Sequence, residues 1–270
     1  MTRPIWGSTR LVRACIWLIG MALALFLVLP FLVLVPISFN SGPYLEFPPR
    51  GFSLQWYYSF LNRPGWLEAA LTSVWVGSLT VLLAVPIGVT AAWSLVRCQI
   101  RLRAIITGVI ILPIVFPAIV LAIAMYMYFV SLHILGSLIG LVVAHTVLAV
   151  PFVVIVIKAS LEGVDESFER AARSLGGGPV RVFRTITLPL IRPAIFAGSL
   201  LAFVTSFDEV VLAIFLTAPD TVTLPRKMWE SVNFEVDPTS SAVATILIVS
   251  SCGLFAMAGL IRRIAKGWRR

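Results

Sequence analysis

Long apolar runs separated by short polar segments most constrain what this 270-residue chain can fold into. A helix needs about 20 apolar residues to cross the hydrocarbon core of a bilayer. Six segments reach this length, and they are residues 14–37, 69–96, 104–131, 137–159, 193–217 and 240–261. The pattern predicts an all-α integral membrane protein, with one domain built as a bundle of six transmembrane helices.

The composition agrees with a membrane protein. Only 12% of the residues are charged and 59% are hydrophobic, whereas soluble domains contain about 25% charged residues. The net charge of +9 comes from short basic clusters that flank apolar runs. We therefore expect contact with lipid and no nucleic-acid partner. The first apolar run is too long for the apolar region of a signal peptide, so we expect it to remain as the first span.

The basic residues also predict the orientation of the chain. Of the 21 Lys and Arg residues, 17 lie before the first span, in loop 97–103, in segment 158–192 or after the last span. The other loops share the remaining four. Because Lys and Arg are enriched in cytoplasmic loops, both termini and the loop 160–192 are predicted to be cytoplasmic.

Sequence motifs for enzyme chemistry are absent from the chain. It contains no G-x-x-x-x-G-K-[ST] nucleotide loop, no H-E-x-x-H motif and no G-x-S-x-G motif. The three cysteines, Cys15, Cys98 and Cys252, have neither metal-site nor disulfide spacing. We expect no catalytic residue, no metal site and no cofactor bound by this chain.

The cytoplasmic loop carries the signals of two short helices. Asp165 is placed to cap the first helix, and Gly176 can take the left-handed conformation that ends it. Pro179 suits the first turn of a second helix, which Pro189 is expected to end or kink. Residues with helical spacing form one narrow apolar face, and they are Phe168, Ala171, Ala172 and Leu175. The residues alone leave two readings open, packing against the chain's own bundle or docking on a partner protein.

This loop resembles the EAA signature of permease subunits of type I ABC importers, whose pattern is E-A-A-x3-G-x9-I-x-L-P. Six positions match in register, and they are Ala171, Ala172, Gly176, Ile186, Leu188 and Pro189. The chain departs from the signature at the glutamate position, where Arg170 stands and Glu169 lies one residue earlier. A shift of one residue turns the carboxylate by about 100° around the helix.

The resemblance implies a fold, a role for the loop and a set of partners. The fold is that of a type I importer permease, and the loop would act as the coupling helix that docks on an ATPase subunit. The residues implied in this contact are Glu169, Arg170, Ala171, Ala172, Arg173, Gly176, Ile186, Leu188 and Pro189. The implied partners are a second permease that completes a heterodimer, two ATPase subunits that bind ATP and Mg²⁺, and a periplasmic substrate-binding protein. The implied location is the bacterial inner membrane.

The segment SFDEVVLAIFLTAPDTVTLPRKMWESVNFEVDP, residues 206–238, is similar to the second permease of spermidine/putrescine-type importers. The resemblance implies a small organic cation as substrate. An aminophosphonate, an opine or another amine in the same architecture remains an alternative. An ion-coupled secondary transporter is a further alternative, although the chain has no obvious inverted repeat. A membrane-embedded enzyme would need catalytic residues, and none is visible.

Asp208 and Glu209 are the only carboxylates inside the predicted spans. A charge within the bilayer is costly, so these two are candidates for the substrate path, where they would attract a cationic amine. A structural ion pair with the partner permease, or a position at the outer interface, is the alternative. Thr205 and Ser206 are expected to hydrogen-bond beside the carboxylates.

Two further features of the spans lead to expectations about packing. His145 lies inside the fourth span, and a lone histidine there is read as a packing residue rather than a proton carrier. Gly136 and Gly140 form a GxxxG pair that would allow close contact between helices.

Overall fold

The computed structural model describes residues 10–235 and 237–267, and these form helices without a β-strand. The predicted all-α class is confirmed. The chain divides into two compact units, one made by the N-terminal part up to Arg63 with the C-terminal part from Ser231, and one made by Pro64–Glu230. The first unit contains α1 (Arg10–Ile37), α2 (Gln55–Asn62), the π-helix η2 (Ser231–Glu235) and α12 (Thr239–Gly267).

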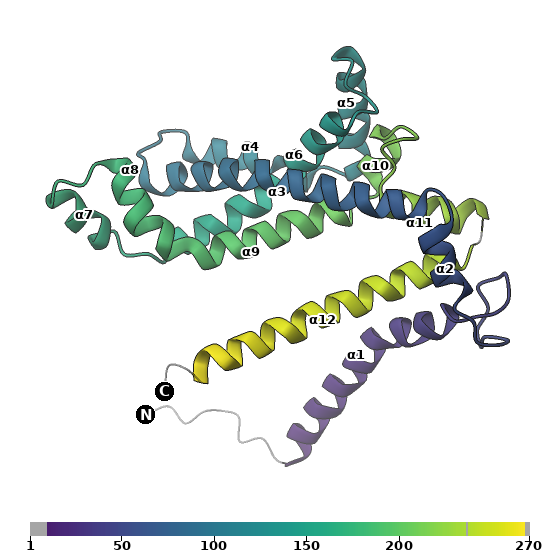
Figure 1. Ribbon diagram of the computed structural model, residues 1–270. Coiled ribbons are helices and arrows are strands. Elements are labelled where there is room, and N and C mark those ends of the chain that lie inside the picture. Colours follow the sequence, from purple (N-terminus) through teal and green to yellow (C-terminus); the bar gives the residue numbers. More distant parts are fainter. Residues whose placement is uncertain (1–9, 236, 268–270) are drawn as a thin grey trace. The chain divides into compact units, whose positions relative to one another are not determined.

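The second unit contains the remaining helices (Figure 1). They are α3 (Trp66–Arg97), α4 (Arg103–Val115), α5 (Ala118–Ser131), α6 (Leu138–Glu162), α7 (Ser167–Ser174), α8 (Pro179–Val182), the π-helix η1 (Phe183–Thr187), α9 (Leu188–Phe207), α10 (Val211–Leu216) and α11 (Leu224–Glu230).

Four helical segments are long and apolar enough to cross a membrane, and they are 12–37, 66–97, 138–162 and 179–207. The pair α4 and α5 adds a fifth span if the two helices are counted together. Over the predicted sixth span lies α12, and within the residues whose side chains are described its apolar stretch is Thr239–Gly253. The described residues thus contain four or five spans by length and composition, and six spans stay a prediction.

The third predicted span, 104–131, is not one straight helix. It is broken into α4 and α5, which meet at an angle of 101°. The residue before Pro117, Phe116, has an extended backbone with φ −69° and ψ 142°. A proline ring disfavours the helical conformation in the preceding residue and has no N–H to donate, so the helix ends here and a new one begins.

The fifth predicted span, 193–217, does not coincide with one helix. A continuous helical segment runs from Pro179 to Phe207 through α8, η1 and α9. Pro189 therefore does not end the second helix of the loop. The π-turn of η1 directly precedes Leu188 and Pro189, and a widened turn of this kind accommodates a proline that cannot make the regular hydrogen bond. The connection between α6 and this helix is consequently shorter than the predicted loop 160–192.

The core of the second unit forms where α3, α6 and α9 run alongside one another (Figure 1). Small residues set the spacing between these helices, because Ala84, Ala92 and Ala149 are fully buried in their contact. Gly88 lies directly against Val153, and a Cβ atom added at position 88 would stand 2.7 Å from the Val153 Cβ. The closest approach of α3 and α6 therefore depends on a glycine.

Gly136 and Gly140 do not lie together on one helix, as the predicted GxxxG packing motif requires. Gly136 lies before α6 with φ +76°, and its N–H donates to the Leu216 carbonyl. Gly140 lies in the first turn of α6 against the carbonyl of Ile134. The two glycines serve a turn and a helix start, because the helix begins only at Leu138.

In the first unit, a buried aspartate holds the start of α12. Asp237 is 6% exposed, forms an ion pair with Arg63, and accepts hydrogen bonds from the backbone N–H and the hydroxyl of Thr239 at 2.9 and 2.7 Å. A carboxylate that accepts from the first N–H groups of a helix acts as a cap. By contrast, the side chains of α1 are largely exposed, with Trp17 at 72% and Phe26 at 73%. Such an apolar surface fits lipid or another protein.

Candidate functional site

The short helix α7 lies at one end of the second unit, beyond the ends of α3 and α9 (Figure 1). Local chemistry fixes both of its ends. The Asp165 carboxylate accepts a hydrogen bond from the Ser167 N–H at 2.8 Å, and this contact lowers the pKa of Asp165. After α7, Gly176 has φ +83°, as the sequence predicts for the residue that ends the helix. The N–H of Gly177 then donates to the Ala172 carbonyl at 3.0 Å.

The apolar face of α7 points away from its own bundle. Phe168 is 57% exposed, Leu175 is 89% exposed, and Ala171 between them is exposed as well. The spacing i, i+3 and i+7 places the three on one side of the helix. We call these residues the α7 stripe. Ala172, which was predicted on the same face, is partly buried.

The buried side of α7 carries a charge. The Glu169 side chain is only 4% exposed and lies 3.1 Å from the Nε of Arg97, whose side chain is 7% exposed. The Thr187 hydroxyl donates to the same Glu169 oxygen at 2.9 Å. The sequence grouped Glu169 with residues that would contact a partner, and the structure instead places its carboxylate inside the chain's own fold.

The other predicted coupling residues divide between surface and interior. Arg170 and Arg173 have side chains that are 66% and 54% exposed, and each lies within 4 Å of a glutamate of α7 or its cap. The second part of the signature is half-buried on η1 and the start of α9, and its residues are Ile186, Leu188 and Pro189.

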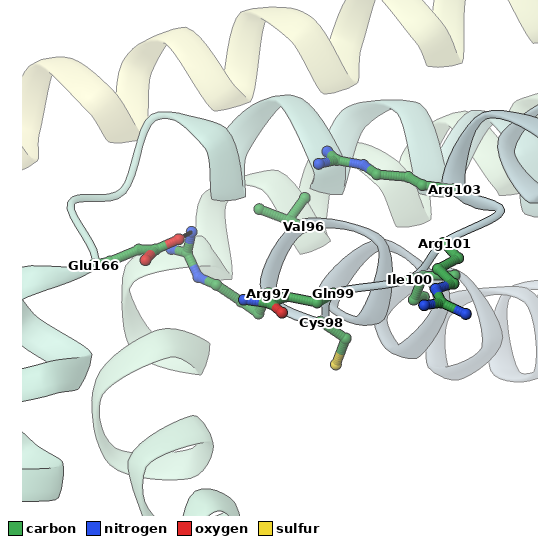
Figure 2. Close-up of a pocket in the computed structure, with 8 residues that line it drawn as sticks. All are labelled: Val96, Arg97, Cys98, Gln99, Ile100, Arg101, Arg103 and Glu166. Atoms are coloured by element: carbon green, nitrogen blue, oxygen red, sulfur yellow. Dashed lines mark hydrogen bonds and ion pairs between the residues drawn. The ribbon is translucent and has the colours of Figure 1, made fainter.

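A pocket of about 580 Å³ opens between the α3–α4 loop and the start of α7. Its lining residues are Val96, Arg97, Cys98, Gln99, Ile100, Arg101, Arg103 and Glu166. Figure 2 shows Arg97 reaching toward Glu166, with 3.1 Å between Nη1 and Oε1. Arg103 is paired with Glu162 at 3.3 Å. The basic charges of the pocket are thus largely balanced by neighbouring carboxylates, which does not favour an anion site.

Asp208 and Glu209 lie in the break between two helices. The reason is that α9 ends at Phe207 and α10 begins at Val211. Glu209 accepts a hydrogen bond from the Leu212 N–H at 3.0 Å and so caps α10. Asp208 is exposed at the C-terminal end of α9, where the helix dipole disfavours a negative charge. Of the two, Asp208 is the carboxylate whose position local structure does not explain.

The residues before these carboxylates face different surroundings from those predicted. Ser206 is 5% exposed, and its hydroxyl lies 2.8 Å from Nδ1 of His145 and 3.4 Å from the Thr80 hydroxyl. Its polar contacts thus lie in the bundle, not with Asp208 or Glu209. Thr205 is half-buried at the end of α9. His145 is 1% exposed, and its Nε2 has no hydrogen-bond partner among the described residues.

Sequence reasoning missed Arg97 and Thr187, the two side chains that contact Glu169 from outside α7. Arg97 is the last residue of an apolar helix. In the sequence it served only, with the other basic residues, to predict the orientation of the chain in the membrane. A possible signal was the presence of an arginine and a glutamate near two helix ends on the same predicted side of the membrane. Spacing along the chain does not pair them, because 72 positions separate Arg97 from Glu169.

Comparison with known proteins places the chain in a family. The sequence model described as "Binding-protein-dependent transport system inner membrane component" matches residues 84–270. The chain is 33% identical over 242 residues to the spermidine/putrescine transport system permease protein PotC of Escherichia coli strain K12, which covers 90% of this chain and 91% of PotC. It is 35% identical over 243 residues to the putrescine transport system permease protein PotI of the same strain, with 87% and 85% covered.

A relative named for a different cargo and a solved structure complete the comparison. The molybdenum transport system permease protein ModB of Escherichia coli strain K12 is 36% identical over 209 residues, with 70% of this chain and 89% of ModB covered. A chain of the crystal structure of a bacterial ABC transporter involved in alginate import superposes with a TM-score of 0.77 at 17% identity. The match covers 96% of this chain and 99% of that one, and it shows a shared fold. The chain therefore belongs to the family of inner-membrane components of binding-protein-dependent transport systems, the permease subunits of ABC importers.

Proposed function

We propose that this permease moves a small organic cation such as spermidine or putrescine into the cell by alternating access. PotC and PotI, which are named for these polyamines, support the substrate class because they match 90% and 87% of the chain. ModB reaches similar identity over only 70% of the chain. Identity alone does not separate these cargoes, and coverage favours the polyamines. An aminophosphonate, an opine or another amine is the alternative within the same architecture.

The α7 stripe is the single observation that carries the proposal for coupling. An eight-residue helix and its C-cap, Leu175, expose Phe168, Ala171 and Leu175, while the buried side of the helix is fixed by Glu169. Exposed apolar residues on a short amphipathic helix suit a groove on a partner protein. We infer that α7 is the coupling helix, which docks on an ATPase subunit. Arg170 and Arg173 beside the stripe would add charge-assisted contacts to acidic residues there.

The complete transporter follows from this role. It would contain this chain, a second permease, two ATPase subunits that bind ATP and Mg²⁺, and a periplasmic substrate-binding protein. The distribution of Lys and Arg supports cytoplasmic termini and a cytoplasmic α7. Closure of the ATPase dimer on ATP would push α7 and rock the permeases to accept substrate, and hydrolysis would let them release it inward.

The test is ATP hydrolysis and uptake by the complete transporter reconstituted in liposomes. The binding protein is offered spermidine, putrescine, an aminophosphonate or molybdate. We expect the polyamines to stimulate hydrolysis and to accumulate inside the liposomes. Stimulation by the aminophosphonate or molybdate alone would keep the architecture and overturn the substrate. Uptake by permeases reconstituted without the ATPase subunits would instead show an ion-coupled secondary transporter.

Asp208 is the better candidate for contact with a cationic substrate. We expect Asp208→Asn to lower polyamine uptake at sub-saturating concentration by about fivefold, because an exposed charge pair contributes up to about 1 kcal/mol. Maximal uptake should change little. The matched control is Glu209→Gln, whose carboxylate is already used at the start of α10. Initial uptake rates over a range of spermidine concentrations measure the effect. Equal apparent affinity in wild type and Asp208→Asn would remove Asp208 from the path.

A further inference from the structure

We propose that Arg97, Glu169 and Thr187 form an internal latch that makes α7 move together with α3 and α9. The latch rests on the proposed coupling role of α7. It assigns Glu169 a positioning role within this chain instead of a contact with the ATPase subunit. It also assigns a role to Arg97, which lies outside the EAA-like segment.

One carboxylate oxygen joins three helices. Glu169 Oε1 on α7 lies 3.1 Å from Arg97 Nε at the end of α3 and 2.9 Å from the Thr187 hydroxyl at the end of η1, just before α9. Thr187 is fully buried. Any displacement of α7 that keeps this carboxylate bonded must therefore carry the ends of both spans with it.

Arg97 also holds the chain that leads into α7. Its guanidinium donates to the Val164 carbonyl and to the Glu166 carboxylate, at 3.1 Å each, as well as to Glu169. The planar guanidinium offers several donors in fixed directions, which a lysine does not. Figure 2 shows the Arg97 end of this arrangement beside Glu166. One side chain thus fixes the entry to the helix and its first turn.

The backbone connections of α7 would transmit movement poorly without the latch. On one side, the segment 163–166 between α6 and α7 is not helical. On the other side, α7 is followed by the glycines at 176–178. Loops and glycines absorb displacement by changing φ and ψ. The side-chain bridge to Arg97 and Thr187 is the stiffer connection.

Burial makes the latch costly to open. The Arg97 and Glu169 side chains are 7% and 4% exposed, so water does not replace a lost partner. Replacing one of the two removes the buried partner of the other and leaves it only an exposed one, Glu166 for Arg97 or Arg173 for Glu169, whereas replacing both leaves no buried charge in the pair. Just along the same helices, the rings of Trp93 on α3 and Phe183 on η1 pack edge to face with centroids 5.9 Å apart. Packing between α3 and η1 therefore supports the polar bridge formed by Arg97, Glu169 and Thr187.

The experiment uses the complete reconstituted transporter with the double variant Arg97→Gln/Glu169→Gln. This variant leaves no unpaired buried charge in the pair, so the permease should fold and keep its ATPase subunits. We expect ATPase subunits to co-purify as with wild type, while substrate moved per ATP hydrolysed falls roughly tenfold, a usual size for coupling between sites. The single variant Arg97→Lys should couple transport to ATP hydrolysis better than the double variant but less well than wild type. Lysine keeps the positive charge but cannot make all the directed hydrogen bonds of the guanidinium.

The matched control is Arg103→Gln/Glu162→Gln, which removes an ion pair whose side chains are 44% and 50% exposed and which lies on α4 and α6 instead of α7. It should leave substrate moved per ATP close to the wild-type value. Normal coupling in the double variant with the complex intact would overturn the latch. Loss of ATPase subunits from the double variant would also overturn it, because Glu169 would then be a docking residue. A failure of the docking proposal is separate, since Leu175→Asp would then leave the ATPase subunits attached.

Discussion

Leu175→Asp is expected to abolish ATP-driven transport by releasing the ATPase subunit. Leu175 is 89% exposed, so its side chain has no structural role that the substitution would disturb within the permease. Burying a leucine in an interface stabilises it by about 1.5–3 kcal/mol. A carboxylate at position 175 would lose this stabilisation, and moving it out of water into the interface would add a desolvation cost. Together these weaken the affinity for the ATPase subunit by roughly 100-fold.

Co-purification of the ATPase subunit with the tagged permeases measures this effect, and liposome uptake measures its consequence. The matched control is Ser174→Asp, which places the same charge on the next residue but off the α7 stripe. The control should retain most of the ATPase subunit, because neighbouring helical positions point about 100° apart. If Leu175→Asp transports as well as the control, α7 does not dock through this stripe.

Gly88→Val is expected to destabilise the bundle by about 3 kcal/mol. A Cβ at position 88 would stand 2.5 Å from Cγ1 and 2.7 Å from Cβ of Val153. Valine is stiff at χ1 in a helix, so Val153 has little freedom to turn away. The helices α3 and α6 would have to separate. The loss should appear as a lower thermal unfolding temperature of the detergent-solubilised permease.

Gly108→Val is the matched control for this substitution. Gly108 also lies inside an apolar helix, α4, but a Cβ there meets nothing within 4 Å. Both variants exchange a glycine for the same β-branched residue, so they differ only in the contact. We expect Gly108→Val to unfold at the wild-type temperature or slightly above it. Equal unfolding temperatures in the two variants would contradict the close packing of α3 on α6.

The predicted spans show which features of the fold a local sequence pattern can predict. Apolar length predicted the segments where the long helices form, because the need to satisfy backbone groups in lipid acts on each segment by itself. It did not predict the bend at Pro117 or the passage of a helix through Pro189. A proline can kink, end or be accommodated in a helix, and neighbouring helices decide which of these occurs.

In the candidate site, too, local sequence predicts the helix, and packing between distant segments decides its surroundings. The sequence by itself determined that a short amphipathic helix lies between two apolar spans, because helical spacing, an aspartate cap and a terminating glycine are local properties. The apolar face that it predicted contains Phe168, Ala171, Ala172 and Leu175. Only the tertiary structure decided which side of that helix is buried. The partner of Glu169 is Arg97, 72 positions away, and their pairing follows from the packing of α3 beside η1 and α9. Burial and charge pairing depend on contacts between distant segments, which no local spacing contains.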